Sequence, residues 1–319
     1  MKYYFAPLEG ITNSIYRNAY FELYGSNGVD KFYAPFVSPS ANPELRGKEI
    51  ADILPENNNP QMNLIPQILA NRADYFIKAS KQLIGLGYDK EINLNIGCPS
   101  GTVTSKDKGS GFLRHTDLME EFFEEVFNWR DAEYPSLKIS VKTRIGFYDA
   151  DEFPAILDVY NKYPISELTV HPRTKVQMYK DMPNMTAYKY ARDNAQVPLV
   201  YNGNINCVED YNRLLCGIGV DAIMLGRGLI GNPNLVNELN GGPSLTKPQI
   251  KEYLDKIRDA YRPYCPSDNN ILFKLKEFWT YVSLNFEDPH KAAKLIRKAQ
   301  TLDKYNQAVE TVFSTIDLK

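Results

Sequence analysis

The chain has 319 residues but only four cysteines, three histidines and two tryptophans, and these scarcities exclude several classes of protein. No two cysteines have the CxxC spacing of zinc sites or thioredoxin-type pairs, so we expect no metal and four reduced thiols. No run of about 18 apolar residues occurs, so we expect no membrane span. The opening MKYYFAPLEG lacks the apolar core of a signal peptide, and we therefore predict a cytoplasmic protein.

An excess of charge is also missing. The formal net charge is −2, with 43% hydrophobic and 24% charged residues, as in an ordinary globular protein with no overall attraction to nucleic acid. Residues 244–319 carry 13 Lys and Arg against 10 Asp and Glu, whereas the rest of the chain is acidic. This weakly basic end is compatible with RNA contact and equally with an ordinary solvated surface.

Short β-rich runs alternate with helix-like segments along the first 240 or so residues. The predicted strands are residues 2–6, 31–36, 64–68, 91–96, 137–143, 167–172, 198–202 and 221–226. The helix-like segments include residues 71–86, 116–130, 151–162, 186–194 and 207–216. This alternation predicts parallel strands with crossover helices, and eight strands favour a closed (β/α)8 TIM barrel over an open doubly wound sheet. No GxGxxG follows the first strand, as a dinucleotide-binding open sheet would require.

The pattern changes after GGPS at residues 241–244, where four segments of helical periodicity follow one another. Thr246 and Asp288 stand where helix N-caps belong, with Pro248 and Pro289 in the first turns. We therefore predict a barrel domain over residues 1–243 and an all-helical domain over residues 244–319.

Polar residues stand at nearly every predicted strand end, which is where the active site of such a barrel lies. They are Glu9, Gln67, Asn95, Cys98, Lys142, Arg144, His171, Arg173, Asn202, Asn204 and Arg227. A set this dense favours a bound ligand. The last two strand ends carry Gly203 and Gly226, which admit a ligand close to the backbone, and Arg227 suits a phosphate. Alternatively, these glycines simply terminate their strands.

Lys142 and His171 each allow two interpretations. Lys142 follows an apolar run that would direct its ammonium into the barrel mouth, where a cation stabilises an anionic cofactor such as reduced flavin. A strand-end lysine that reaches solvent is the alternative. His171 is either a ligand contact or a structural histidine.

Six stretches in order resemble the tRNA-dihydrouridine synthases, flavin-dependent enzymes that reduce uridine in RNA. They are APLEGITNSIYR, LNIGCPSGTV with GSGFLR, VKTRIGF, HPRTKVQMY, NGNI and DAIMLGRG, within residues 6–228. The C-terminal segment is similar to the helical RNA-binding domain of these enzymes. GCP alone is weak evidence, whereas the ordered set is specific. HPRT replaces the commoner His-Gly-Arg-Thr, and SGF replaces a run of small residues, but neither change removes a group that the chemistry needs.

The resemblance implies a role for each matching position. Cys98 would protonate C5 of uracil after flavin N5 delivers hydride to C6, with NADPH or NADH as reductant. Asn95 and Arg144 would hold the target base. The expected FMN contacts are Pro7, Leu8, Glu9, Gln67, Lys142, His171, Asn202, Gly203, Asn204, Gly226 and Arg227. The basic helices would hold the phosphates of a transfer or ribosomal RNA, bound by a monomer, and the expected contacts are Lys274, Lys276, Lys291, Lys294, Arg297 and Lys298.

Chemistry agrees with the role of Cys98. A thiol with an ordinary pKa of about 8.5 is mostly protonated at neutral pH and acts as a general acid without a histidine partner.

Two rival functions remain at this point. One is an FMN barrel that reduces a small molecule, such as a dihydroorotate or enoate reductase, which needs no basic helical tail. The other is an RNA-binding protein that has lost catalysis, against which Cys98 and Lys142 argue.

Overall fold

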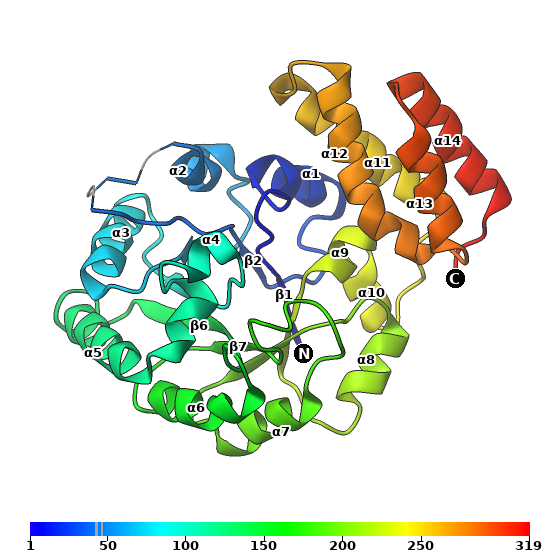
Figure 1. Ribbon diagram of the computed structural model, residues 1–319. Coiled ribbons are helices and arrows are strands. Elements are labelled where there is room, and N and C mark those ends of the chain that lie inside the picture. Colours follow the sequence, from blue (N-terminus) through cyan, green and yellow to red (C-terminus); the bar gives the residue numbers. More distant parts are fainter. Residues whose placement is uncertain (42–43, 46) are drawn as a thin grey trace.

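A computed structural model describes residues 1–41, 44–45 and 47–319 (Figure 1). Within these residues, nine parallel strands form one sheet in the order β3-β2-β1-β9-β8-β7-β6-β5-β4. The strands are β1 (Lys2–Phe5), β2 (Lys31–Tyr33), β3 (Leu64–Ile65), β4 (Gln67–Ile68), β5 (Glu91–Ile96), β6 (Lys138–Arg144), β7 (Leu168–His171), β8 (Leu199–Asn202) and β9 (Ala222–Leu225).

The two edges of this sheet are halves of one strand. Pro66 separates β3 from β4 because its ring nitrogen carries no hydrogen and cannot donate to a neighbouring strand. β3 pairs with β2 and β4 pairs with β5, and the Pro66 carbonyl accepts from the Asn93 N–H at 3.0 Å. The ring therefore closes as the predicted (β/α)8 TIM barrel, although the strand predicted over residues 64–68 is interrupted at its proline.

Helices surround the ring in the predicted alternation (Figure 1). The longer ones are α1 (Ser14–Tyr24), α3 (Ala73–Gly85), α5 (Thr116–Glu133), α6 (Phe153–Asn161), α7 (Met185–Asn194) and α8 (Val208–Leu215). The short ones are α2 (Lys48–Ile53), α4 (Gly101–Thr104), α9 (Arg227–Gly231) and α10 (Leu235–Leu239), with 3-10 turns at Pro55–Asn57, Gly109–Arg114, Ala150–Glu152, Arg262–Tyr264 and Ser283–Asn285. The sequence prediction omitted the short helices, because their few turns give little periodicity. It also omitted α1, which begins after its N-cap Asn13.

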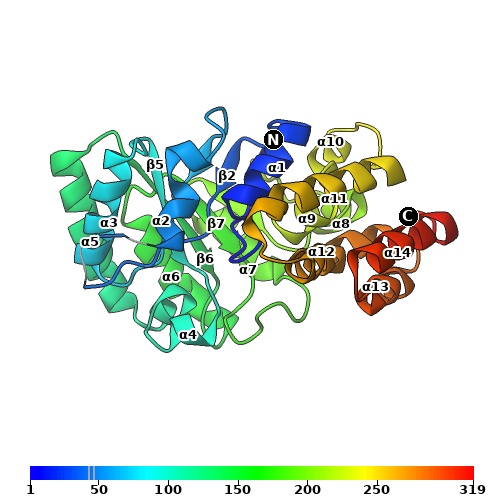
Figure 2. The ribbon, with the colours of Figure 1, turned by 90° about the horizontal axis from the view of Figure 1, so that it is seen from above.

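The C-terminal region is helical, as predicted, and comprises α11 (Lys247–Tyr261), α12 (Asp268–Val282), α13 (Pro289–Lys298) and α14 (Leu302–Thr315). The predicted caps are present, because the Thr246 N–H donates to Gln249 Oε1 at 2.9 Å and Asp288 Oδ1 accepts from the Lys291 N–H at 2.8 Å. The four helices lie together at one side of the barrel, near α1 and α9 (Figures 1 and 2). The domain boundary after residue 243 stays a prediction.

Aromatic side chains join the helical region to the barrel. The rings of Tyr16 on α1 and Phe278 on α12 stack with centroids 5.2 Å apart, and the hydroxyls of Tyr16 and Tyr253 lie 2.7 Å apart. All three side chains are buried. The helical region therefore shares an apolar core with the outer layer of the barrel, which fixes its position beside the strand ends. Among the described helices, none has the length and apolar character that crossing a membrane requires.

Candidate active site

One pocket at the carboxyl ends of the strands brings together most of the predicted cofactor contacts. It contains about 550 Å³ of empty space, including the part open to solvent. Nine of the eleven predicted residues line it, namely Pro7, Leu8, Lys142, His171, Asn202, Gly203, Asn204, Gly226 and Arg227. Gln67 instead lies buried in the barrel interior, and Glu9 lines a larger neighbouring cavity. The structure brings these nine residues together in one pocket, whereas their cofactor role stays a prediction.

The pocket is strongly cationic. No Asp or Glu occurs among the described residues that line it. Burial, and then the charge of Arg144, lowers the pKa of Lys142 to about 7, and within the described chain its ammonium has no hydrogen-bond partner. Burial and the neighbouring cations Arg144 and Lys142 also hold the pKa of His171 well below its ordinary value, so its ring is neutral. A pocket with unpaired positive charge and no carboxylate favours an anionic ligand.

Two arginines converge on Asn204 at the end of β8. Arg173 and Arg227 both donate to Asn204 Oδ1, at 3.1 and 3.2 Å. Asn204 has a φ of 47°, a left-handed conformation that asparagine adopts more readily than most residues. Sequence reasoning placed Arg173 at a strand end without giving it a role. The sequence signal that could have assigned Arg173 to the site is its spacing of two residues from His171. The Nε2 atom of His171 lies 2.9 Å from Arg173 Nη1.

Sequence reasoning missed Tyr179, which lines the same pocket. Its ring centroid lies 5.4 Å from the Arg144 guanidinium, 5.0 Å from that of Arg227 and 6.0 Å from the His171 ring. Arg144 fastens the loop that carries Tyr179, because Nη1 donates to the carbonyls of Thr174 and Met178 at 3.0 and 2.8 Å. A single tyrosine in a polar loop gives no sequence signal of this placement.

The backbone of Cys98 is fixed from both sides. Its N–H and that of Gly97 both donate to Asn95 Oδ1 at 2.9 Å. Its carbonyl accepts from the N–H of Ser110 at 3.0 Å and from the Ser110 hydroxyl at 2.9 Å. Gly109 has a φ of 55°, and a Cβ there would lie 2.8 Å from the Cys98 oxygen, so only glycine allows this close approach. The turn therefore holds the thiol in a fixed place.

The surroundings of Cys98 keep it a thiol. Burial raises its pKa above the ordinary value, and this outweighs a backbone hydrogen bond from Ser100 and the nearby charges of Lys142 and Arg144, which act in the opposite direction. No histidine is among the groups that influence it in the described chain. A protonated thiol beside a cationic pocket is equipped to donate a proton rather than to attack as a nucleophile.

The two predicted base contacts are largely occupied by the protein itself. Asn95 Nδ2 donates to Gln67 Oε1 at 2.8 Å, in addition to the two backbone bonds at its Oδ1. Arg144 Nε donates to the Gly97 carbonyl at 2.9 Å, and its Nη1 fastens the Tyr179 loop. Both residues therefore shape the wall around Cys98, and their contact with a base stays a prediction.

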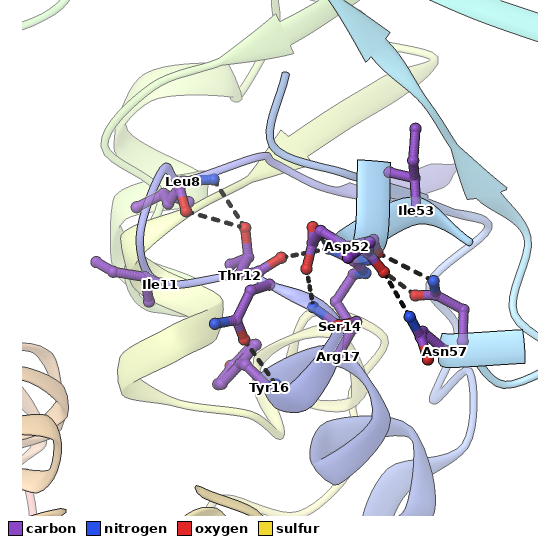
Figure 3. Close-up of polar contacts among 12 residues, drawn as sticks. Leu8, Ile11, Thr12, Ser14, Tyr16, Arg17, Asp52, Ile53 and Asn57 are labelled. Carbon is purple, nitrogen blue, oxygen red and sulfur yellow. Dashed lines mark hydrogen bonds and ion pairs between the residues drawn. The ribbon is translucent and has the colours of Figure 1, made fainter. Parts of the chain in front are cut away.

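A partly buried ion pair anchors the loop that contains Leu8 (Figure 3), and Pro7 and Leu8 line the pocket. Arg17 donates to the Thr12 carbonyl at 2.6 Å and pairs with Asp52 Oδ2 at 3.0 Å. Thr12 Oγ1 in turn accepts from the Leu8 N–H at 2.8 Å. The loop is thereby tied to α1 and α2 from outside the barrel.

The predicted RNA contacts lie apart from the pocket. Lys291, Lys294, Arg297 and Lys298 are exposed on α13 and line neither the cationic pocket nor the larger cavity. We call these four residues the α13 basic face. The other two predicted contacts, Lys274 and Lys276, are instead engaged within the protein, because Lys274 donates to the Gly10 carbonyl at 2.8 Å and Lys276 donates to the Ala299 carbonyl.

Comparisons with known proteins identify a family. Residues 4–309 match the family described as Dihydrouridine synthase (Dus). A probable tRNA-dihydrouridine synthase of Staphylococcus aureus is 30% identical over 239 residues, which cover 72% of this chain and 68% of the relative. The tRNA-dihydrouridine(16) synthase of Haemophilus influenzae is 25% identical over 310 residues, which cover 95% and 97%.

Solved structures support the fold alone. An old yellow enzyme homologue from Zymomonas mobilis is similar with a TM-score of 0.51 at 13% identity, over 79% of this chain and 92% of that one. Morphinone reductase is similar with a TM-score of 0.50 at 13% identity, over 79% of this chain and 88% of that one. The similarity is confined to architecture and carries no information about substrate.

Proposed function

From the premise that this chain belongs to the dihydrouridine synthase family, and is thus an oxidoreductase, we propose that it reduces uridine to 5,6-dihydrouridine in tRNA. We further propose FMN as the bound cofactor, NADPH as the reductant, and a monomer acting in the cytoplasm. The observation that carries the proposal is a protonated thiol at Cys98, on a turn whose backbone is fixed, beside a cationic pocket whose described lining contains no carboxylate.

The residues of the pocket fit FMN by charge. Reduced FMN is an anion at both its phosphate and its ring, and Lys142 and Arg227 supply cations at separate points of the pocket. Arg227, whose guanidinium donates to Asn204, would hold the phosphate, with the buried Arg173 held on the same asparagine behind it, and Lys142 would face the anionic edge of the ring. When bound, FMN supplies the hydride that uridine accepts at C6.

The protein's own part in the chemistry is proton delivery and positioning. Hydride addition at C6 places negative charge on C5 and O4 of the base, and Cys98 Sγ would give its proton to C5. The half-buried Cys98 is protonated before the reaction, and the nearby cations Lys142 and Arg144 favour the thiolate left afterwards. The target base must leave its stack to reach the pocket, at a cost of a few kcal/mol, so weakly stacked loop uridines are the natural substrates.

The phosphate assignment makes a quantitative prediction. Arg227→Ala is expected to weaken FMN binding by about 1.5–3 kcal/mol, because it removes a hydrogen bond to a charged group. Quenching of flavin fluorescence on titration of the FMN-free protein measures the affinity. Arg213→Ala, which removes an exposed arginine of α8 paired with Asp210, is the matched control and should leave the affinity unchanged. Equal affinities in the two variants would remove Arg227 from the phosphate site.

The α13 basic face is the proposed site for the tRNA backbone. Reversing Lys294, Arg297 and Lys298 to Glu is expected to weaken tRNA binding and to lower the slope of log K against log salt by about 0.9 for each phosphate that is no longer neutralised. FMN content should not change, because none of the three residues lines the pocket.

A control variant with the same change of charge is available at the amino ends of the barrel strands, the end opposite the pocket. Lys2, Lys90 and Lys138 are exposed at the amino ends of strands, and their reversal to Glu should leave the salt slope near that of the unmodified protein. If both triple variants bind tRNA with the unmodified affinity and slope, the α13 basic face is an ordinary solvated surface.

The proposed function itself is tested by mapping dihydrouridine in cellular tRNA and rRNA with and without this protein. We expect at least one tRNA position to lose the modification, and purified yellow protein with NADPH to restore it. Free uridine offered to the same enzyme should be consumed far more slowly. Unchanged tRNA maps in the absence of the protein would overturn the proposal, and rapid consumption of a small enone instead would favour a small-molecule reductase.

A further inference from the structure

A chain of side-chain hydrogen bonds crosses the barrel interior from the Cys98 turn to the amino ends of the strands. Its members are all buried and run in the order Asn95, Gln67, Asn93, Ser140 and Glu91. The four successive donor–acceptor distances are 2.8, 2.7, 2.9 and 2.8 Å. We call this set the barrel relay. It connects the residue that holds the Cys98 N–H with a carboxylate at the far end of β5.

The two ends fix the direction of every bond in the barrel relay. At the upper end the backbone N–H groups of Gly97 and Cys98 can only donate, so Asn95 must present its oxygen to them and its NH₂ to Gln67. At the lower end a carboxylate can only accept, so the Ser140 hydroxyl donates to Glu91 and accepts from Asn93. Both assignments require Gln67 to accept from Asn95 with its oxygen and to donate to Asn93 with its NH₂. The flipped orientations of these three amides are therefore excluded.

The lower end is an anchored anion. Lys31 Nζ lies 2.7 Å from Glu91 Oε2 and 2.5 Å from Glu167 Oε2, and the Tyr33 hydroxyl donates to Glu91 at 3.3 Å. Burial opposes the charge on Lys31, but the two carboxylates outweigh it and raise its pKa. Every donor in the barrel relay thus points toward a fixed negative charge, an arrangement in which successive hydrogen bonds polarise and strengthen one another.

We propose that Asn93 and Ser140 are positioning residues for Cys98, acting through Gln67 and Asn95 to hold the turn at the place from which the thiol donates its proton. Neither residue lines the pocket, and their side-chain hydrogen bonds run to Gln67, to each other and to Glu91. The proposal rests on the proposed function for its catalytic consequence, whereas its structural consequence, a fixed Cys98 turn, is measurable without any RNA.

The test uses Asn93→Leu, which keeps the shape of the side chain without its polar atoms, and Ser140→Ala, which removes only the bridging hydroxyl. Ser80→Ala is the matched control, because Ser80 is equally buried, on α3, and its hydroxyl has no partner in the described chain. The first readout is the rate at which iodoacetamide alkylates Cys98 in the purified protein, divided by the rate at the half-buried Cys207 and followed by peptide mass spectrometry.

We expect this ratio to rise several-fold in Asn93→Leu and Ser140→Ala and to stay unchanged in Ser80→Ala. General loosening of the fold would raise both rates together and leave the ratio unaltered. The second readout is single-turnover reduction of tRNA by the pre-reduced enzyme, which we expect to slow by about ten- to a hundredfold in both relay variants, since a small misplacement of a reacting group has that effect. Reduction of the flavin by NADPH should not change.

The two hypotheses fail in distinguishable ways. If the alkylation ratios of both relay variants equal that of Ser80→Ala, the barrel relay only packs the interior and the inference is overturned. If the ratios rise but even the unmodified enzyme reduces no RNA, the positioning of Cys98 stands and the proposed function falls. If the ratios rise while tRNA reduction keeps its unmodified rate, the relay holds a turn on which the reaction does not depend, and the catalytic part is overturned.

Discussion

Replacing Cys98 with alanine is expected to slow the reduction of tRNA uridine by the pre-reduced enzyme about 10²–10⁴-fold, the usual consequence of losing a general acid. The variant should still bind FMN and accept electrons from NADPH, because neither step needs the sulfur. Single-turnover mixing of pre-reduced enzyme with tRNA isolates the step that should fail. Cys98→Ser should recover little of the rate, because an alcohol is a far weaker acid than a thiol.

The other cysteines provide the control. Cys207 and Cys216 flank α8 and Cys265 follows α11, so alanine at these positions should leave the single-turnover rate nearly unchanged. A Cys98→Ala enzyme that reduces tRNA at the unmodified rate would show that the proton comes from another donor. The hydrogen bonds to Asn95 and Ser110 would then fix a turn with no part in proton transfer.

The affinity for reduced FMN, whose ring edge is anionic, is expected to depend on pH through Lys142. In the free protein its pKa is lowered to about 7, by burial first and by Arg144 next, and a bound anion would raise it again. Below pH 7 the ammonium is charged in both states, so affinity is full and independent of pH. Above pH 7 binding requires uptake of a proton, and affinity falls by up to about tenfold per pH unit until the pKa of the bound state is reached.

Lys142→Met is the variant that tests this linkage. We expect it to lose about 2–5 kcal/mol of reduced-FMN binding at pH 6, the cost of removing one partner of a buried charge pair, and to lose the fall in affinity between pH 7 and 9. Calorimetry in buffers of different ionisation enthalpy measures the proton uptake directly. Lys138→Met, at the exposed opposite end of the same strand, should keep both the affinity and the slope. A Lys142→Met slope equal to that of the unmodified protein would assign the titration to another group.

The ring of strands was accessible from sequence because each strand carries its own local pattern. Glu91–Ile96 is a strand over the predicted residues, and most other predicted strands keep their centres with shifts at the ends, whereas the strand predicted over residues 64–68 is divided at its central Pro66. The sequence prediction did not use the proline within that apolar run as a signal, and the use of Pro66 as the point where the barrel closes depends on both neighbouring strands. Helix caps at Thr246 and Asp288 were likewise local, since each includes a bond between a side chain and a backbone N–H of residues three apart in the sequence.

By itself, the sequence determined the barrel, the helical C-terminal region and the grouping of Lys142, His171, Asn202, Gly203 and Arg227 at one mouth, because parallel strands in a closed ring place all their carboxyl ends together. Only the tertiary structure decided that Tyr179 stands between two arginines, that Arg173 shares Asn204 with Arg227, and that Asn93 and Ser140 connect Cys98 to Glu91. These contacts join loops and strands separated by tens of residues along the chain. Their distances depend on how neighbouring strands are aligned and how a loop folds back over them, and no local pattern of side chains encodes either.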